Sequence, residues 1–144
     1  MDQLRLIALD EQDLNVISAH VQDAVMKVRD LQYLPGARRF ALGMSRFAWE
    51  RKSGFLRKNN ERRQSVLHFD RVLGARTAGI ARDKPDEVLS LLAVSYVPAE
   101  KPAGIIELIF SGGGVIMLDV ECVEARLTDT GGAWQASSRP AHRI

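Results

Sequence analysis

The sequence of 144 residues predicts a single α+β domain, in which one N-terminal amphipathic helix precedes a mainly antiparallel meander of about seven to eight strands, open or barrel-like. Three observations lead to this fold class. A helical apolar stripe occurs near the N-terminus, apolar residues alternate with a period of two afterwards, and the connections between the alternating segments are too short for crossover helices. Hydrophobic residues make up 46% of the chain, which is enough for one core.

The predicted helix spans residues 11 to about 23 and follows a short strand at residues 4–9. Asp10 stands at the N-cap position, where a carboxylate accepts a hydrogen bond from a free backbone N–H. Asp13 places a second carboxylate in the first turn, where the helix dipole favours negative charge. The apolar stripe of this helix consists of Leu14, Ile17, Val21 and Val25.

The rest of the chain is predicted to form strands joined by turns. Pro35-Gly36 suits the centre of a type II turn. Gly112-Gly113-Gly114 suits a hairpin turn, because a phosphate-binding loop would need a helix after it and a strand follows instead. Residues 51–63 lack apolar periodicity and are predicted to form an exposed loop. The predicted strands cover residues 26–34, 38–49, 65–80, 88–97, 105–110 and 115–122, and residues 123–127 either extend the last strand or form a helical turn.

One domain is predicted over residues 1–130, followed by a polar, loosely ordered tail over residues 131–144. No apolar run reaches the roughly 18 residues that a membrane helix needs, and the N-terminus lacks the pattern of a secretory signal. Cys122 is the sole cysteine, which excludes an internal disulfide bond. We therefore expect a cytoplasmic protein without a transmembrane segment.

The positive charge is concentrated in residues 46–63, which contain seven basic and two acidic residues. Together with Phe47, Trp49 and Phe55, these cations could bind the phosphates and bases of a nucleic acid, or contact an anionic membrane surface. No nucleic-acid motif accompanies them, and Phe47 and Trp49 fit core positions of a strand, so a solvated loop is the simpler interpretation. The candidate anion-binding residues are Arg51, Lys52, Arg57, Lys58, Arg62 and Arg63.

A second candidate site is an acidic face of the hairpin around Gly112-Gly113-Gly114. A symmetric turn gives the other face to the core and sets Glu107 directly across from Asp119. Like charges in a cross-strand pair are destabilising, so we expect a basic neighbour such as Arg71 or Arg76, a bound cation or a basic partner. Solvated carboxylates, or a register shifted by one residue, are the simpler interpretation. The acidic strand face consists of Glu107, Asp119 and Glu121. The core face consists of Ile106, Leu108, Phe110, Ile116, Leu118 and Val120.

The three histidines do not assemble into a recognisable site. His68 lies in a predicted strand and could act as a base or a metal ligand, or simply point outward. An enzyme would require His68 to converge with Glu107, Asp119 or Glu121 in one pocket. Cys122 shares the parity of the core residues, so we expect a buried, inert thiol. The sequence thus predicts no catalytic residue, no cofactor and no metal ligand.

Several segments resemble an uncharacterised, mainly alphaproteobacterial family that is known as domain-of-unknown-function family 2948. The resemblance spans nearly the whole chain and implies a single-domain bacterial member of that family. It brings no activity, cofactor or site residue. The segments that carry it are Leu4–Asp10, Ser18–His20 with Asp23-Ala24, Tyr33–Pro35, Arg38–Leu42, Arg46–Glu50 and Gly112–Asp129.

The leading hypothesis is a non-enzymatic interaction module that binds a protein partner or a second copy of itself. It rests on a full apolar core without a convergent polar constellation, and on the free strand edges that a meander offers for pairing. The first alternative is nucleic-acid or anion binding through the basic loop 46–63. The second alternative is a small enzyme that combines His68 with a carboxylate.

Overall fold

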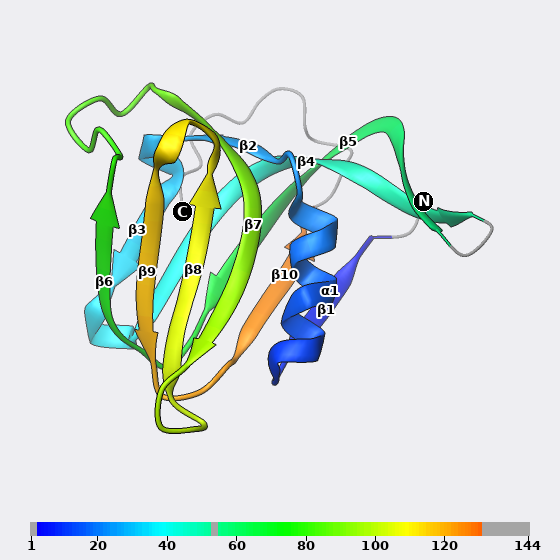
Figure 1. Cartoon of the computed structure of the whole chain (residues 1–144). Coiled ribbons are helices and arrows are strands. Elements are labelled where there is room, and N and C mark those ends of the chain that lie inside the picture. The colour runs from blue at the N-terminus through cyan, green and yellow to red at the C-terminus, as the bar shows by residue number, and fades with distance from the viewer. Residues whose placement is uncertain (1–2, 53–54, 131–144) are drawn as a thin grey trace.

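The computed structural model describes residues 3–52 and 55–130 of the chain. In these ranges the backbone forms ten strands, one α-helix and three short 3-10 turns (Figure 1). No helix of the described residues is both long and apolar enough to cross a membrane. The strands are β1 (Arg5–Ala8), β2 (Val25–Lys27), β3 (Leu31–Leu34), β4 (Arg39–Lys52), β5 (Phe55–Phe69), β6 (Val72–Ala78), β7 (Val88–Pro98), β8 (Gly104–Phe110), β9 (Val115–Val120) and β10 (Ala125–Asp129), and the helix is α1 (Glu11–Val21).

The fold class predicted from the sequence is wrong, because the described residues are mainly antiparallel sheet and form an all-β structure with a single helix. The prediction of seven to eight strands also falls short of ten. The predicted strand 26–34 is divided by the 3-10 turn Val28–Asp30. The predicted strand 65–80 is divided between β5 and β6, where Arg71 takes a left-handed conformation with φ 62°. Apolar residues occur on both sides of each break, which is why one strand was predicted in each place.

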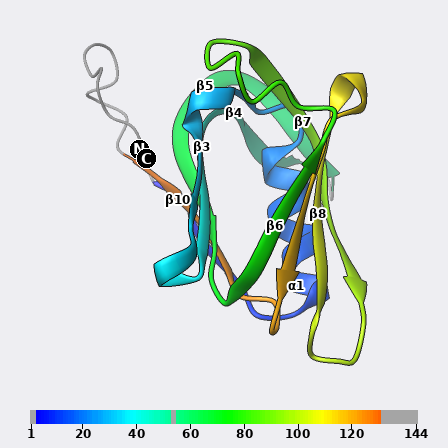
Figure 2. The same ribbon diagram turned by 90° about the vertical axis from the view of Figure 1, so that its left-hand side faces the viewer.

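The ten strands form one sheet in the order β1-β10-β5-β4-β2-β7-β8-β9-β6, and β3 pairs with β4 outside this path. Every pairing is antiparallel. Because β2 has only three residues, β4 and β7 diverge beyond it and the sheet folds into two facing layers. Figure 2 shows β3, β4, β5 and β10 on one side, β6 and β8 on the other, and α1 between them. We call β7, β8, β9 and β6 the four-stranded layer.

The core fills the space between the two layers. From the four-stranded layer it receives Ile106, Leu108 and Phe110, each at most 2% exposed, so this part of the predicted core face is correct. Ile116, Leu118 and Val120 of β9 are buried as well, as predicted. Burial of each such side chain contributes about 1.5–3 kcal/mol to stability.

Helix α1 begins and ends for local reasons that the sequence shows. The Asp10 carboxylate accepts a hydrogen bond from the Asp13 backbone N–H at 2.8 Å, which confirms the predicted N-cap. The helix ends at Val21, and Asp23 follows in a left-handed conformation with φ 67°. Leu14 and Ile17 are fully buried against the sheet. The helix therefore covers the opening that β4 and β7 leave where they diverge (Figure 1).

The predicted exposed loop at residues 51–63 is wrong, because β4 and β5 continue through it as a two-stranded ribbon. The pairing runs from Phe40 with Phe69 to Lys52 with Phe55, with one irregularity between Phe47 and Trp49. The ribbon projects beyond the rest of the sheet (Figure 1). Among the described side chains of this part, Phe55, Arg57 and Lys58 are all exposed, so the apolar alternation that reveals other strands is absent here.

Both predicted turns differ in detail from the structure. The predicted type II turn at Pro35-Gly36 is a 3-10 turn over Pro35–Ala37, and the left-handed residue is Arg38 with φ 52°. The glycine turn does join a hairpin, with Gly112 at φ 85° and Gly113 at φ 97°. Glycine adopts these angles without steric cost. Residues 123–127 neither extend the preceding strand nor form a helical turn, because Ala125–Leu127 belong to the separate strand β10 and Val123 and Glu124 precede it. The predicted tail over residues 131–144 lies outside the described residues.

Candidate functional site

The ribbon directs several of its cations toward groups of the protein itself. Arg62 donates hydrogen bonds to the backbone oxygen and the hydroxyl of Ser45, at 2.7 Å and 2.9 Å. The Arg62 guanidinium also lies 4.1 Å from the centre of the Phe47 ring. Lys58 Nζ lies 4.2 Å from the centre of that ring and 3.6 Å from the Asp23 carboxylate. These two cations therefore stabilise the ribbon and connect it to the end of α1.

The other predicted anion-binding residues do not share one environment. Arg57 is exposed, whereas Arg63 is largely buried and donates to Glu61 at 3.1 Å. The side chains of Arg51 and Lys52 lie outside the described residues. Phe47, expected in the core, lies instead on the ribbon beneath the two cations. Most of the described cations of this segment thus contact groups of the same chain.

Arg46, which belongs to the same basic segment, points into the protein and forms a buried ion pair with Asp129. The Arg46 and Asp129 side chains are 3% and 4% exposed. Asp129 Oδ1 accepts from Arg46 Nη2 at 2.7 Å, from Arg46 Nε at 3.2 Å and from the Ser65 hydroxyl at 2.7 Å. Asp129 Oδ2 accepts from the Leu4 backbone N–H at 2.9 Å. This cluster joins β10 to β4, β5 and the residue before β1.

Burial and hydrogen bonding act in opposite directions on the pKa of the Asp129 carboxyl. Burial alone raises its pKa, but hydrogen bonds from the Leu4 N–H, the Ser65 hydroxyl and the Arg46 guanidinium outweigh burial, so the pKa lies below its ordinary value of 3.8. The carboxylate is therefore ionised at neutral pH. Sequence reasoning missed this pair, because 83 residues separate its members and nothing local to either indicates burial.

His68 contacts Asp70 and not the acids with which the enzyme hypothesis combined it. Its Nδ1 lies 3.4 Å from Asp70 Oδ2, and Asp70 Oδ1 accepts from Arg39 Nε at 2.7 Å. Burial lowers the pKa of His68 below its ordinary value of 6.5, and the positive charge of Arg39 lowers it further. His68 lies on β5, whereas Glu107 and Asp119 lie on β8 and β9 in the other layer. The structure therefore does not assemble the suggested His68–carboxylate site.

The acidic strand face has a different register from the symmetric one. Glu107 lies across from Met117, and Asp119 lies across from Ile105, so the like-charged pair does not form. The register is shifted by two residues, which preserves the face of every side chain. Asp119 accepts from Arg76 Nη2 at 3.3 Å. Glu121 accepts from Arg71 Nη1 at 3.4 Å, and from Arg38 Nη1 at 3.1 Å. Arg71 and Arg76 are the two neighbours that the sequence suggested, whereas Arg38 was not among them.

The outer face of the four-stranded layer is mainly apolar, although an outward-facing antiparallel sheet is usually polar. The backbone pairing places its side chains in three rows that cross the layer from β7 to β6. No helix or strand of the described residues packs on this face (Figure 1). Its rows are Ala93–Ile109–Val115–Ala78, Ser95–Glu107–Met117–Arg76 and Val97–Ile105–Asp119–Gly74.

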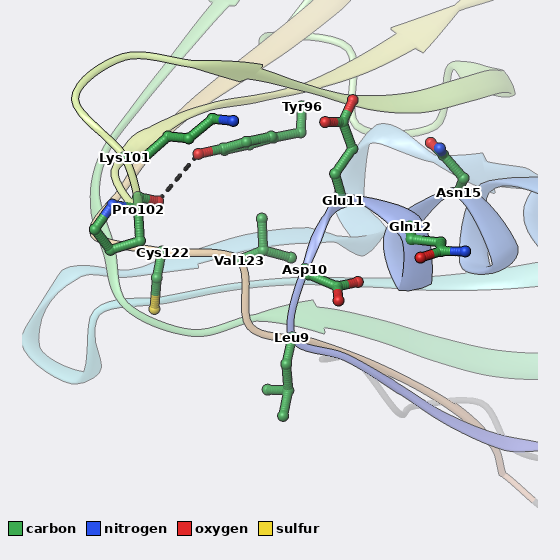
Figure 3. Close-up of a pocket in the computed structure, with 10 residues that line it drawn as sticks. All are labelled: Leu9, Asp10, Glu11, Gln12, Asn15, Tyr96, Lys101, Pro102, Cys122 and Val123. Atoms are coloured by element: carbon green, nitrogen blue, oxygen red, sulfur yellow. Dashed lines mark hydrogen bonds between the residues drawn. The ribbon is translucent and has the colours of Figure 1, made fainter.

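A groove of about 830 Å³ lies beside the first turn of α1 (Figure 3). Tyr96 and Lys101 line one side, and Glu11 of α1 lies across from them. The Tyr96 hydroxyl donates to backbone oxygens of the β7–β8 connection at 3.1 Å, so it is already engaged. The free N–H groups of the helix are partly satisfied by the Asp10 cap. The groove therefore lacks an arrangement that selects a ligand.

Cys122 and the acidic side chains form no catalytic or metal-binding cluster in the described ranges. Cys122 lines the same groove and is half-buried, whereas a buried thiol was expected. Residues 3–52 and 55–130 contain no group of three or more His, Cys, Asp and Glu side chains placed to hold a metal ion. The feature that differs most from an ordinary surface is the apolar outer face of the four-stranded layer.

Comparison with protein families gives one match. The family described as "Protein of unknown function (DUF2948)" matches residues 4–142, nearly the whole chain. Neither the comparison with curated proteins nor the comparison with solved structures found a match.

Proposed function

The chain belongs to the DUF2948 family, and we propose that it is a non-enzymatic interaction module that pairs with a second copy of itself through the outer face of the four-stranded layer. The observation that carries this proposal is the apolar composition of that face. Ile105 and Ile109 alternate with the single charge of Glu107 along β8, and Val115 and Met117 continue the apolar surface on β9. Apolar sheet faces of this kind are typical of contacts between proteins.

The charges on this face favour a second copy as the partner. Arg76 and Glu107 lie in one row, on either side of Met117. In a two-fold symmetric pair whose axis runs along β9, Glu107 lies opposite Arg76 of the partner subunit, and the reverse contact follows from symmetry. Met117 lies at the axis. Arg76 already contacts Asp119 of its own chain at 3.3 Å, so in such a pair it would be shared between Asp119 and Glu107 of the partner subunit. The packing of two such sheets face to face is a common arrangement.

The size of the face predicts a weak association. Four strands about 4.8 Å apart, and three rows about 6.8 Å apart along the strands, give a planar area of about 400 Å². A stable interface takes about 800 Å² of accessible surface from each partner. We therefore expect a reversible dimer with a dissociation constant in the micromolar range or weaker.

Sedimentation equilibrium over a concentration series tests the proposal. The native chain is expected to shift from monomer to dimer, and Met117→Glu is expected to remain monomeric because it places like charges at the axis. Val16→Glu is the matched control, since Val16 is an exposed valine on α1 and its replacement leaves the outer face unchanged. A monomer at every concentration, or a Met117→Glu dimer as stable as the native one, would refute self-pairing.

A second candidate function, anion or nucleic-acid binding, is favoured by the shape of the ribbon. Two-stranded ribbons fit the major groove of DNA, and this one projects from the body and carries the exposed Arg57. The engagement of Lys58 and Arg62 with Asp23, Ser45 and Phe47 counts against it.

Titration with heparin and mixed oligonucleotides at two salt concentrations tests this candidate. A variant with the six predicted cations changed to Gln is compared with Arg5→Gln/Arg126→Gln, which removes two exposed arginines outside the ribbon. The candidate is supported if binding requires the ribbon cations and the logarithm of the binding constant falls by about 0.7–0.9 per phosphate contact for each tenfold increase in salt. Equal binding by both variants excludes it.

A further inference from the structure

The two layers leave a cavity of about 630 Å³ between the free edges of β3 and β6. At one end the layers are tied together, because the Val72 N–H donates to the Arg38 backbone oxygen at 2.9 Å. Beyond that bond β3 pairs only with β4, and β6 pairs only with β9. The edges therefore separate and open the interior to one side, the side that faces the viewer in Figure 2.

The inner wall of the cavity is apolar. Phe40 and Ile116 form its floor and are 5% and 0% exposed. Leu31 and Tyr33 of β3 line one side, and Ile80 lines the other. The volume lies within the range of about 300–1,000 Å³ that is typical of small-molecule sites, and the mouth of a barrel-like sheet is a usual place for one. Such a lining favours an apolar ligand body over water.

The rim of the cavity carries a surplus of positive charge. It contains three arginines, Arg29, Arg76 and Arg82. Arg29 forms an ion pair with Asp86, and Arg76 forms one with Asp119. Arg82 makes neither an ion pair nor a hydrogen bond with any residue in the described part of the chain. One cation at the mouth is therefore available to a bound molecule.

We propose that this cavity binds an amphipathic anion, a molecule with an apolar body that fills the space between β3 and β6 and a single carboxylate or phosphate that pairs with Arg82. The apolar walls account for the body and the unpaired guanidinium accounts for the head group, because Arg binds both carboxylate and phosphate through two parallel hydrogen bonds. The proposal does not require pairing through the outer face: the ligand would occupy the inward-facing side of the layer, and only Arg76 at the rim borders both sites.

Calorimetric titration with dodecanoate, dodecyl phosphate and neutral 1-dodecanol, each below its aggregation concentration, tests the binding of the apolar body and the pairing of the anionic head group with Arg82. We expect the two anions to bind at least about tenfold more tightly than the alcohol, as one charge-assisted contact implies. Arg82→Gln is expected to remove that difference and leave dodecanol binding unchanged. Arg126→Gln, which changes an exposed arginine on β10, is expected to bind all three probes as the native chain does. The two anionic probes show whether the head group that is preferred is a carboxylate or a phosphate.

Amide chemical shifts locate the binding and exclude a nonspecific contact with the apolar outer face. Shifts that concentrate in β3 and β6 support the cavity, and Thr77→Phe is expected to abolish them because Thr77 lines it. No binding of any probe, equal binding of anions and alcohol, an unchanged anion preference in Arg82→Gln, or shifts confined to the outer rows would each overturn the proposal. Arg82 is exposed, so its replacement tests the idea even if Thr77→Phe fails to fold.

Discussion

Replacement of Asp129 by Ala is expected to destabilise the fold far more than loss of an ordinary ion pair. The substitution leaves the Arg46 guanidinium, 3% exposed, without its carboxylate partner. Removal of one member of a buried pair typically costs about 3–5 kcal/mol, because the remaining charge is buried without compensation. Arg46 keeps the Ser65 hydroxyl and the Phe47 backbone oxygen as acceptors, so we expect the lower end, about 3 kcal/mol.

Urea unfolding followed by circular dichroism measures this loss as the free energy of unfolding. The double variant Arg46→Met/Asp129→Leu removes both charges and places apolar side chains in the same space. We expect it to lose only about 1–2 kcal/mol, because no buried charge is left unpaired and the remaining cost comes from the Ser65 hydroxyl and the Leu4 N–H, which lose Asp129 as acceptor. The two single losses should therefore not add, which the double-mutant cycle shows directly.

Two results would refute this reasoning. A loss below about 1 kcal/mol for Asp129→Ala is the value of a solvated surface pair and would mean that the cluster is open to water. Losses that add in the double variant would mean that Arg46 and Asp129 contribute separately. Ser65→Ala is a useful companion variant, because it keeps the ion pair and removes the hydrogen bonds of the hydroxyl with Arg46 Nε and Asp129 Oδ1. Both partners are charged, so it should cost about 1.5–3 kcal/mol.

Three further predictions concern single features of the fold. Gly104→Ala is expected to destabilise the β7–β8 hairpin, because the added methyl would lie 2.5 Å from Tyr96 Cε1 and 2.6 Å from the Val97 backbone oxygen. The urea concentration at the midpoint of unfolding should fall, and an unchanged midpoint would contradict the prediction. Asp10→Ala should cost about 1 kcal/mol in urea unfolding through loss of the N-cap of α1, whereas Asp10→Asn, which keeps an acceptor, should cost less. His68 has a lowered pKa in the folded chain, so the unfolded chain binds more protons near pH 6 and stability should fall as the pH decreases below about 6.5. The His68→Gln variant should lose that part of the pH dependence in urea unfolding, and an equal slope in both proteins would contradict the assignment.

The sequence identified features that depend on neighbours along the chain. Asp10 and the stripe beginning at Leu14 gave α1, and the alternation around Leu108 and Leu118 gave the hairpin and its buried face. The family resemblance was also correct. These signals succeed because capping and parity are set by residues a few positions apart.

The parts that the sequence could not predict depend on contacts between distant segments. The parity of the β8–β9 hairpin was correct while its register was not, because a shift of two residues changes the partner of Glu107 without changing its face. The ribbon was missed since neither of its faces is buried along its whole length. The inward position of Arg46 depends on Asp129, 83 residues away, and no local pattern distinguishes it from the exposed Arg57.

Strand β6 contributes to both proposed sites, and its alternation allows them to be tested separately. Ala75 and Thr77 pair with Leu118 and Ile116 on the inward side, whereas Arg76 pairs with Met117 on the outward side. A substitution at Thr77 should therefore change ligand binding and leave the dimer intact, and one at Met117 should do the reverse. If either variant abolished both properties while its unfolding transition remained native, the two faces would be coupled through movement of β6. That coupling would have to be reciprocal, so that dodecanoate would shift the dimer equilibrium by the factor by which dimerisation shifts dodecanoate affinity.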